Sequence, residues 1–215
     1  MGPWSAPVKA NDLKRSVLRA IGRAPDPVRS AIEESRAALE RRRVRGKRKI
    51  FCIGRNKTGT TSLRAVFLKK GFVVGNQPEA EVLAHHNYFD GRFDWLDTYC
   101  ETAQFFQDVP FSWPGTFREV DRRFPGSRFI LTVRDDEDQW YASVVRFQKQ
   151  VIGKDRQPTA DDLKTHPFRA IGYMYDTVRV HGTTDASPYD EPTMKAHYLR
   201  HNAEVRAHFA DRPDD

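Results

Sequence analysis

The sequence predicts an α/β fold in which a parallel sheet lies between layers of helices. Short apolar runs, such as Ile50–Ile53 and Arg128–Val133, alternate along the chain with longer segments of helical pattern. Strands that alternate with helices favour a parallel sheet whose two faces are both covered. A chain of 215 residues is long enough for one such domain with a substantial core.

A basic helical extension is predicted ahead of this domain, over residues 1–48. Apolar spacing predicts a first short helix over 11–21, and a stretch rich in Ala, Glu and Arg predicts a second over 27–42. We expect both helices to be appendages without a catalytic role. The α/β domain is predicted to occupy residues 49–215.

The net charge of +7 is concentrated in one run, Arg36–Lys49, just ahead of the first core strand. A basic chain first suggests a nucleic-acid partner, but this distribution argues against one. Two interpretations stay open. The run is either a solvated helix end followed by a linker, or a surface that contacts an anionic partner or membrane headgroups. The sequence has no apolar run of the roughly 20 residues that a membrane helix needs.

The cysteines indicate the compartment. Cys52 and Cys100 are the only two, and their spacing is not that of metal ligands. The N-terminal residues lack the apolar segment of a secretory signal. We therefore expect a folded protein of the reducing cytoplasm, with Cys52 a buried thiol inside a strand. The sequence does not indicate an oligomeric state.

The elements of the domain follow from apolar runs and from the residues that stop helices. Gly71 ends one helical pattern, and the pair Pro125-Gly126 ends another. The run RFILTV has the clearest pattern of a buried strand. The apolar runs predict strands over 50–53, 72–74, 104–109 and 128–133. The other patterns predict helices over 60–70, 79–86, 117–124, 137–150, 160–179 (with a polar interruption) and 191–209, and partly helical structure over 90–99.

The segment KIFCIGRNKTGTTSL has the pattern of a strand, a phosphate-binding loop and a helix. Backbone amides and the positive end of a helix converge on an anion in such a loop. Gly54 and Gly59 have the separation of the glycines in a nucleotide-hydrolase loop, but Thr60 stands where that pattern requires lysine. Lys57, inside the loop, is suited instead to a terminal phosphate with a group attached. The alternative is a simple turn whose glycines serve only the backbone.

Three residues of the predicted site follow predicted strands. Gly54, Asp108 and Arg134 each lie at the end of an apolar run. Ligands of parallel sheets bind at the carboxyl ends of the strands. Topology alone therefore predicts that these three residues meet at one edge of the sheet.

Two segments resemble sulfotransferases that use 3′-phosphoadenosine 5′-phosphosulfate (PAPS). The run GRNKTGTTSL resembles their 5′-phosphosulfate loop, and FPGSRFILTVRDDEDQWYASV resembles their 3′-phosphate segment, with Arg134 and Ser143 in the two binding positions. Ser143 lies one position further from Arg134 than in the family's usual pattern. The resemblance extends from Lys49 to about Phe209, and it implies a sulfotransferase fold that is similar to P-loop nucleotide-binding domains.

The resemblance also implies roles. Lys57 would be the catalytic electrophile, the donor would be PAPS, the product would be adenosine 3′,5′-bisphosphate, and no metal would be needed. The residues expected to bind the donor are Arg55, Lys57, Thr58, Gly59, Thr60, Thr61, Ser62, Arg134 and Ser143. Arg134 would hold the 3′-phosphate, because a planar guanidinium matches an oxyanion better than a point charge does.

Asp108 is the candidate base that deprotonates the acceptor. It lies two residues before Pro110, where cytosolic sulfotransferases have a histidine before a proline. A carboxylate needs a raised pKa or very close geometry to act near neutral pH. The alternative is that Asp108 only caps the following turn.

The acceptor is expected to be a small molecule, glycan or lipid that presents a hydroxyl or an amine. His85, His86 and Trp113 are candidate contacts in its pocket. Adjacent histidines of a helix point in different directions, so a metal shared by the histidine pair is not expected.

Two other functions compete with sulfuryl transfer. One is a nucleotide kinase or NTPase of related fold, and the other is a non-catalytic protein that binds anions. The chain ends at ADRPDD, where the resemblance leads us to expect a further strand and a closing helix. We therefore expect either a truncated C-terminus or an unusual one.

Overall fold

The structure is a computed structural model that describes residues 26–212. The chain divides into two units, Met1–Arg43 and Val44–Asp215, and each is described by itself. The predicted helix over 11–21 lies outside the described residues. A separate extension over 1–48 therefore stays a prediction. No helix within 26–212 is both long and apolar enough to cross a membrane.

The described part of the first unit is a single helix, α2 (Asp26–Val44), which continues to the first residue of the second unit. It begins and ends close to the limits predicted from its composition. Its last turn carries Arg41, Arg42 and Arg43, where cations interact favourably with the helix dipole. Along its surface Arg36 pairs with Glu40 one turn later, at 3.1 Å.

The second unit is an α/β fold with a small parallel sheet flanked by helices. The strands are β1 (Ile50–Cys52), β2 (Phe105–Phe106) and β3 (Arg128–Ile130), in the order β2-β1-β3. Both pairings are parallel, and Phe51 is in register with Phe106 and with Phe129. The ring centroid of Phe51 lies 5.3 Å from that of Phe106 and 5.7 Å from that of Phe129. This phenylalanine row packs the sheet onto the core.

The strands are shorter than predicted. Two of the predicted strands also differ from the structure in another respect, one in whether it forms a strand and the other in its burial. Residues 72–74 do not form a strand, because only Val74 makes an isolated parallel bridge, with Phe105. The RFILTV run was expected to be buried, yet all three residues of β3 are half-buried and Val133 is 42% exposed. The reason is position: β3 is at the edge of the described sheet, so one neighbour is missing.

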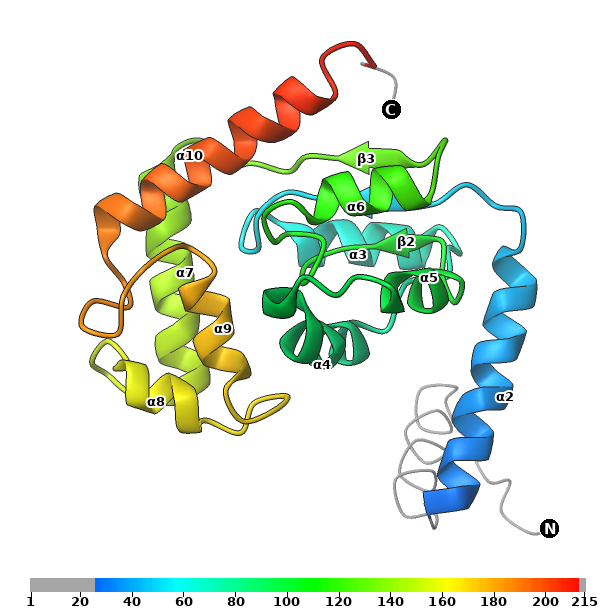
Figure 1. The fold of residues 1–215 in the computed structure, drawn as a ribbon, viewed down its shortest axis with the longest axis horizontal. Coiled ribbons are helices and arrows are strands. Elements are labelled where there is room, and N and C mark those ends of the chain that lie inside the picture. The colour runs from blue at the N-terminus through cyan, green and yellow to red at the C-terminus, as the bar shows by residue number, and fades with distance from the viewer. Residues whose placement is uncertain (1–25, 213–215) are drawn as a thin grey trace, which may run out of the picture. The chain divides into compact units, whose positions relative to one another are not determined.

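Helices connect and cover the strands, as Figure 1 shows for α3 and α6 beside the sheet. Each predicted helix of this unit is present with small changes at its ends. The 160–179 segment divides into α8 and α9, but the residues between them, HPFRAIG, are not the polar interruption that was predicted. The bounds are α3 (Thr60–Lys69), α4 (Gln77–Asn87), the 3₁₀ helix η1 (Tyr88–Asp90), α5 (Trp95–Cys100), α6 (Thr116–Arg123), α7 (Glu137–Ile152), α8 (Ala160–Thr165), α9 (Tyr173–Arg179) and α10 (Glu191–His208).

Two apolar clusters hold the unit together. One surrounds Phe51 and Ile53 under the sheet, and the other lies among α7, α9 and α10, with Trp140 and Met194 at its centre. Helices α7 and α10 pack against each other, as do α8 and α9 (Figure 1). Helix α9 also contacts α4. Cys52 is a buried free thiol, as predicted, and Cys100 is buried as well.

Candidate active site

The Gly54–Gly59 loop connects β1 to α3, and its two glycines are required for different reasons. A Cβ on Gly54 would lie 2.2 Å from the carbonyl oxygen of Thr132, so only glycine lets the loop approach the chain beyond β3. Gly59 has a φ of 97° and is the N-cap of α3, a conformation that other residues adopt at a cost. Gly54 therefore allows close contact with the chain beyond β3, and Gly59 allows the sharp start of α3.

Donors from the surrounding protein hold the carbonyl groups of this loop. The Thr58 hydroxyl donates to the Arg55 carbonyl at 2.5 Å, and the Trp140 indole donates to the Asn56 carbonyl at 3.0 Å. Nε of Arg134 donates to the Lys57 carbonyl at 2.7 Å. These hydrogen bonds occupy the carbonyl groups of the loop, so the backbone N–H groups are the ones that remain for a ligand.

The first amides of α3 are available to an anion. A helix leaves its first backbone N–H groups without partners inside the helix. Among the described residues, no backbone acceptor outside α3 binds the amides of Gly59, Thr60 or Thr61. Gly59, Thr60 and Thr61 also line a cavity, so these amides belong to its wall. A helix N-terminus with free amides at a cavity is chemically suited to a phosphate or sulfate group.

The cavity has a volume of about 390 Å³ and gathers residues from distant parts of the chain. Its walls come from the Gly54–Gly59 loop, α4, the segment after β2, the segment after β3, α7, and the region from the α8–α9 connection into α9. The predicted site residues that line it are Lys57, Gly59, Thr60, Thr61, Asp108, Arg134 and Ser143. Asp108 and Arg134, two of the three residues that the topology predicts to meet, line the cavity together with Lys57 of the loop, whereas Gly54 does not line it.

Lys57 and Asp108 have opposite charges on the same cavity wall. The ammonium nitrogen of Lys57 lies 4.2 Å from the centroid of the Phe147 ring. Burial lowers the pKa of Lys57, and the nearby Asp108 carboxylate partly opposes that change.

Asp108 lies in a setting that favours its neutral form. Burial and the Glu81 carboxylate raise its pKa to about 6, against the opposing effects of Lys57 and Arg55. Its Oδ1 accepts a hydrogen bond of 3.1 Å from the amide of Val109. The Asp108 carbonyl also accepts a hydrogen bond of 2.9 Å from the Ser112 amide, so this residue begins the following turn as well as lining the cavity. A carboxyl group with a pKa near 6 is ionised at neutral pH and still basic enough to accept a proton.

Arg134 and Ser143 approach the cavity from either side of the turn before α7. The Arg134 amide donates to the Tyr198 hydroxyl at 2.9 Å, which fixes the backbone beyond β3. Nε of Arg134 donates to the Lys57 carbonyl, and the terminal Nη groups of the Arg134 side chain remain for a ligand. Ser143 is buried on the first half of α7.

Three of the predicted donor contacts lie elsewhere. Arg55 is fully buried: Nη1 donates to the Ser112 carbonyl, and Nη2 donates to Nε2 of His181 at 2.8 Å. The Thr58 hydroxyl is 2.7 Å from that of Thr132 and braces the loop. Ser62 is exposed on α3 and does not line the cavity. Arg55 and Thr58 turn toward the core, where their side chains fix the shape of the loop, whereas Ser62 faces solvent on the helix.

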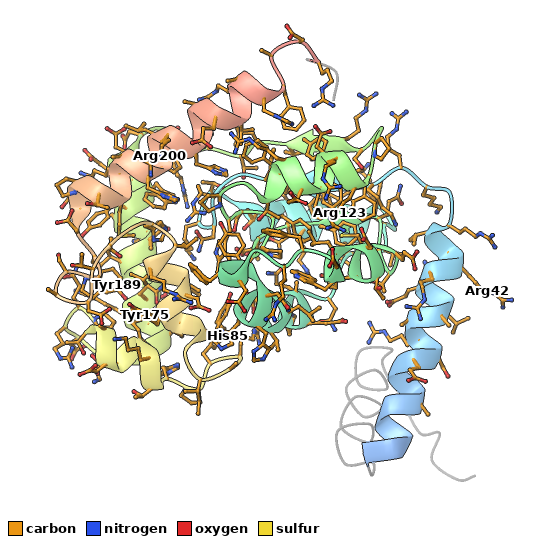
Figure 2. The ribbon with its side chains drawn as sticks, in the orientation of Figure 1. Arg42, His85, Arg123, Tyr175, Tyr189 and Arg200 are labelled. Atoms are coloured by element: carbon orange, nitrogen blue, oxygen red, sulfur yellow. The ribbon has the colours of Figure 1, made fainter. Side chains whose placement is uncertain are left out.

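The candidate acceptor contacts also differ from prediction. Trp113 has no exposed surface, and its ring packs edge-on against Tyr88 at 4.7 Å. His85, labelled in Figure 2, extends from α4 toward α9, where its Nδ1 lies 2.5 Å from Asp176 Oδ2. His86 is exposed. None of these three residues lines the cavity. Large aromatic rings close to a strand end are buried here because the sheet is small and needs them as core.

Sequence reasoning missed the other half of the cavity. Its walls there carry Glu81 from α4, Phe147 from α7, Phe168 and Arg169 from the α8–α9 connection, and Tyr173 from α9. No local motif marks these residues, since the fold alone brings them to the loop. The described residues contain no group of three or more metal-ligating side chains. The prediction of a metal-independent reaction is untested by that observation.

Comparison with known proteins agrees with this geometry. A protein-family model described as a sulfotransferase domain matches residues 49–214, which is well over half of the chain. A search of curated proteins gave no significant match. The matched region contains the Gly54–Gly59 loop and every residue that lines the cavity. The chain therefore belongs to the sulfotransferase-domain family.

Proposed function

We propose that the protein transfers a sulfuryl group from PAPS to a hydroxyl or amine of an acceptor. The observation that carries this proposal is that Lys57, Asp108, Arg134 and the free amides at the start of α3 line one cavity. Lys57 would be the electrophile, Asp108 the base and Arg134 the second anion site. The amides at the start of α3 would bind the 5′-phosphate. The proposal includes a three-layer, P-loop-like arrangement of the full domain around those amides.

The residues present fit a donor with two phosphates. The amides of Gly59–Thr61 suit the 5′-phosphate, and the Nη groups of Arg134 together with Ser143 suit the 3′-phosphate. Lys57 would neutralise the charge that develops on the phosphate oxygen as its bond to sulfur breaks. Most of the acceleration would come from such positioning and electrostatics.

Asp108 would take the proton that the acceptor loses. The acceptor oxygen or nitrogen forms a bond to sulfur while the bond from sulfur to the 5′-phosphate oxygen breaks, and the acceptor proton passes to the carboxylate. The pKa of about 6 suits that transfer near neutral pH, because the carboxylate is ionised before the reaction. The acceptor itself would be a small molecule, glycan or lipid.

Binding of adenosine 3′,5′-bisphosphate tests this function directly. We expect saturable, magnesium-independent binding by calorimetry, and Arg134→Gln should weaken it by about tenfold or more, because charge-assisted hydrogen bonds to a phosphate are lost. Arg122→Gln is the matched control, since Arg122 is an exposed arginine of α6 paired with Glu119. It should leave the affinity unchanged.

Other outcomes of the same experiment favour the competing functions. A preference for ATP–Mg²⁺ over the bisphosphate would indicate a nucleotide kinase or NTPase. Tight binding of the bisphosphate without transfer from PAPS to any hydroxyl or amine of a broad acceptor panel would indicate a non-catalytic protein. Equal effects of Arg134→Gln and Arg122→Gln would contradict the role of Arg134.

A further inference from the structure

Three residues other than glycine have a positive φ in the described part of the chain, and all three line the same cavity. They are Lys57 at 70°, Asp108 at 63° and Arg169 at 66°. The left-handed region costs a non-glycine residue about 1–2 kcal/mol. Such conformations gather at sites where the side chain must point in a set direction. Two of the three are the candidate electrophile and base, and the third has no role yet.

Arg169 is held at the wall of the cavity by an acid and a ring. Its Nε donates to Oε2 of Glu81, and its guanidinium lies 4.6 Å from the Phe168 ring centroid. Glu81 is buried on α4, and its Oε1 also accepts a hydrogen bond of 3.4 Å from Nε2 of Gln77. Through these contacts α4 and the Phe168 ring fix the direction of the Arg169 side chain.

The terminal nitrogens of Arg169 remain available. Within the described residues, the hydrogen bond made by its guanidinium comes from Nε, and no acceptor is recorded for Nη1 or Nη2. The side chain is about one third exposed, so these atoms can meet a ligand. A guanidinium with one edge anchored and the other edge open binds a carboxylate or phosphate in fixed geometry.

Arg169 lines the same cavity as Asp108, and it is not one of the groups assigned to the donor. The cavity lining also includes the apolar or aromatic side chains of Val109, Phe168, Met174 and Tyr173. We propose that Arg169 binds an oxyanion group, a carboxylate or a phosphate, carried by the acceptor whose hydroxyl or amine reacts beside Asp108. This inference rests on the proposed function of the same cavity and names the class of acceptor.

A purely structural role would make Arg169 only the counter-ion of Glu81. That role does not require open Nη groups or a positive φ at the edge of a cavity. The two roles also differ in what the removal of Glu81 does. If Arg169 binds an oxyanion of the acceptor, removal of the Glu81 carboxylate should strengthen that binding. If Arg169 only neutralises Glu81, the same removal should not strengthen it.

Matched probes test the proposal by direct calorimetric binding. The probes are 4-hydroxyphenylacetate, 4-hydroxyphenyl phosphate and the neutral 4-hydroxyphenylacetamide, each measured with saturating adenosine 3′,5′-bisphosphate. We expect at least one oxyanion probe to bind about tenfold more tightly than the amide, which is the size of one charge-assisted contact. Whichever of the two is preferred identifies the source of the oxyanion as carboxylate or phosphate.

Three variants separate recognition from structure. Arg169→Gln should remove the preference for oxyanions and leave the affinity for the bisphosphate unchanged. Glu81→Gln should keep or increase the preference, and it provides the test if Arg169→Gln fails to fold. The control Arg122→Gln removes an arginine of another Arg–Glu pair, outside the cavity, and should change nothing.

Several results would overturn the proposal. They are equal binding of all three probes to the wild type, no saturable binding of either oxyanion probe, or an unchanged preference in Arg169→Gln. If the bisphosphate itself fails to bind, the proposed function fails. The probes are then measured without it, and the preference and its loss in Arg169→Gln still test the site at Arg169.

Discussion

At the scale of single residues, the charges around Asp108 decide what the cavity can do. Burial, and then the Glu81 carboxylate, oppose ionisation of Asp108, while the Val109 amide, Lys57 and Arg55 favour it. The opposing effects leave the pKa at about 6, higher than that of a solvated carboxylate and still below neutral pH. These four charged residues come from three segments of the chain, the Gly54–Gly59 loop, α4 and the segment after β2, so this balance depends on the fold and not on a local motif.

The pH dependence of turnover should follow Asp108. The base must be ionised, so we expect kcat/KM to rise with pH through about 6 and then to level, because kcat/KM reports the pKa values of the free enzyme. Asp108→Asn should lower kcat by about 100-fold or more, the usual contribution of general-base catalysis. It should also remove the acidic limb of the profile while changing the affinity for the bisphosphate little. Equal losses of turnover and of donor affinity would indicate that Asp108 is only a structural cap.

At the scale of elements, the contact between the Gly54–Gly59 loop and the chain beyond β3 is the most demanding in the fold. Cys52 and Thr58 both contact the Thr132 hydroxyl, and Gly54 packs against the Thr132 backbone. This junction sets the position of the loop relative to Arg134, which is only two residues further on. The two anion sites are therefore coupled through one short segment.

Gly54→Ala should break that junction. The added Cβ would meet backbone atoms of Thr132, which cannot move aside as a flexible side chain can. We expect a loss of about 1–3 kcal/mol in the free energy of unfolding, together with weaker binding of the bisphosphate. Gly71→Ala is the control, because a Cβ there meets nothing within 4 Å and costs only the strain of a positive φ. An equal effect of both variants on bisphosphate binding would show that the junction is unimportant.

The elements that could be predicted from sequence are those with a local cause. The apolar run Ile50–Ile53, the stop signal Pro125-Gly126 and the spacing of Gly54 and Gly59 each gave the correct kind of element. The short segment 72–74 could not be assigned correctly, because pairing depends on a partner far along the chain. Burial of the RFILTV run likewise depends on which strand lies at the edge.

The residues of the candidate site also divide into those that the sequence could predict and those that only the fold brings to the cavity. Asp108 and Arg134 could be predicted because parallel strands end at one edge of a sheet, and Lys57 because it lies in a loop with the pattern of a phosphate cradle. Arg169 could not, because it follows no strand and carries no motif, and it reaches the cavity through the packing of α9 on α4. Arg55 was expected in the site because it lies in the loop, but the direction of its side chain is set by His181, 126 residues away.

At the scale of the whole second unit, Arg55 is the centre of a buried cluster of potential cations. Burial lowers its pKa to about 10, so it is charged at neutral pH. His181, His197 and His201 lie around it and are all buried. Since Nδ1 of His181 donates to the Val178 carbonyl at 2.8 Å, its Nε2 accepts from Arg55. Nε2 of His201 donates to the Ile53 carbonyl, also at 2.8 Å, so that histidine ties α10 to the end of β1.

This cluster should make the stability of the unit sensitive to acid. Burial, and then the charge of Arg55, lower the pKa of His201 to about 4, and burial lowers those of His181 and His197 well below the usual value. The unfolded state therefore binds more protons than the native state below about pH 6.5, and stability must fall as the pH decreases. Asp108 acts in the opposite direction below about pH 6, because the native state protonates it first.

Urea unfolding followed by the fluorescence of the buried Trp113 and Trp140 measures the balance. With three histidines against one carboxyl, we expect the free energy of unfolding to fall from pH 7 to pH 5. His201 alone should contribute up to about 1.4 kcal/mol per pH unit. His201→Gln keeps a donor for the Ile53 carbonyl but cannot be protonated, so its profile should be flatter than that of the wild type. His86→Gln, at an exposed histidine, should retain the wild-type slope. If His201→Gln retains that slope as well, the histidine cluster does not control the response to acid.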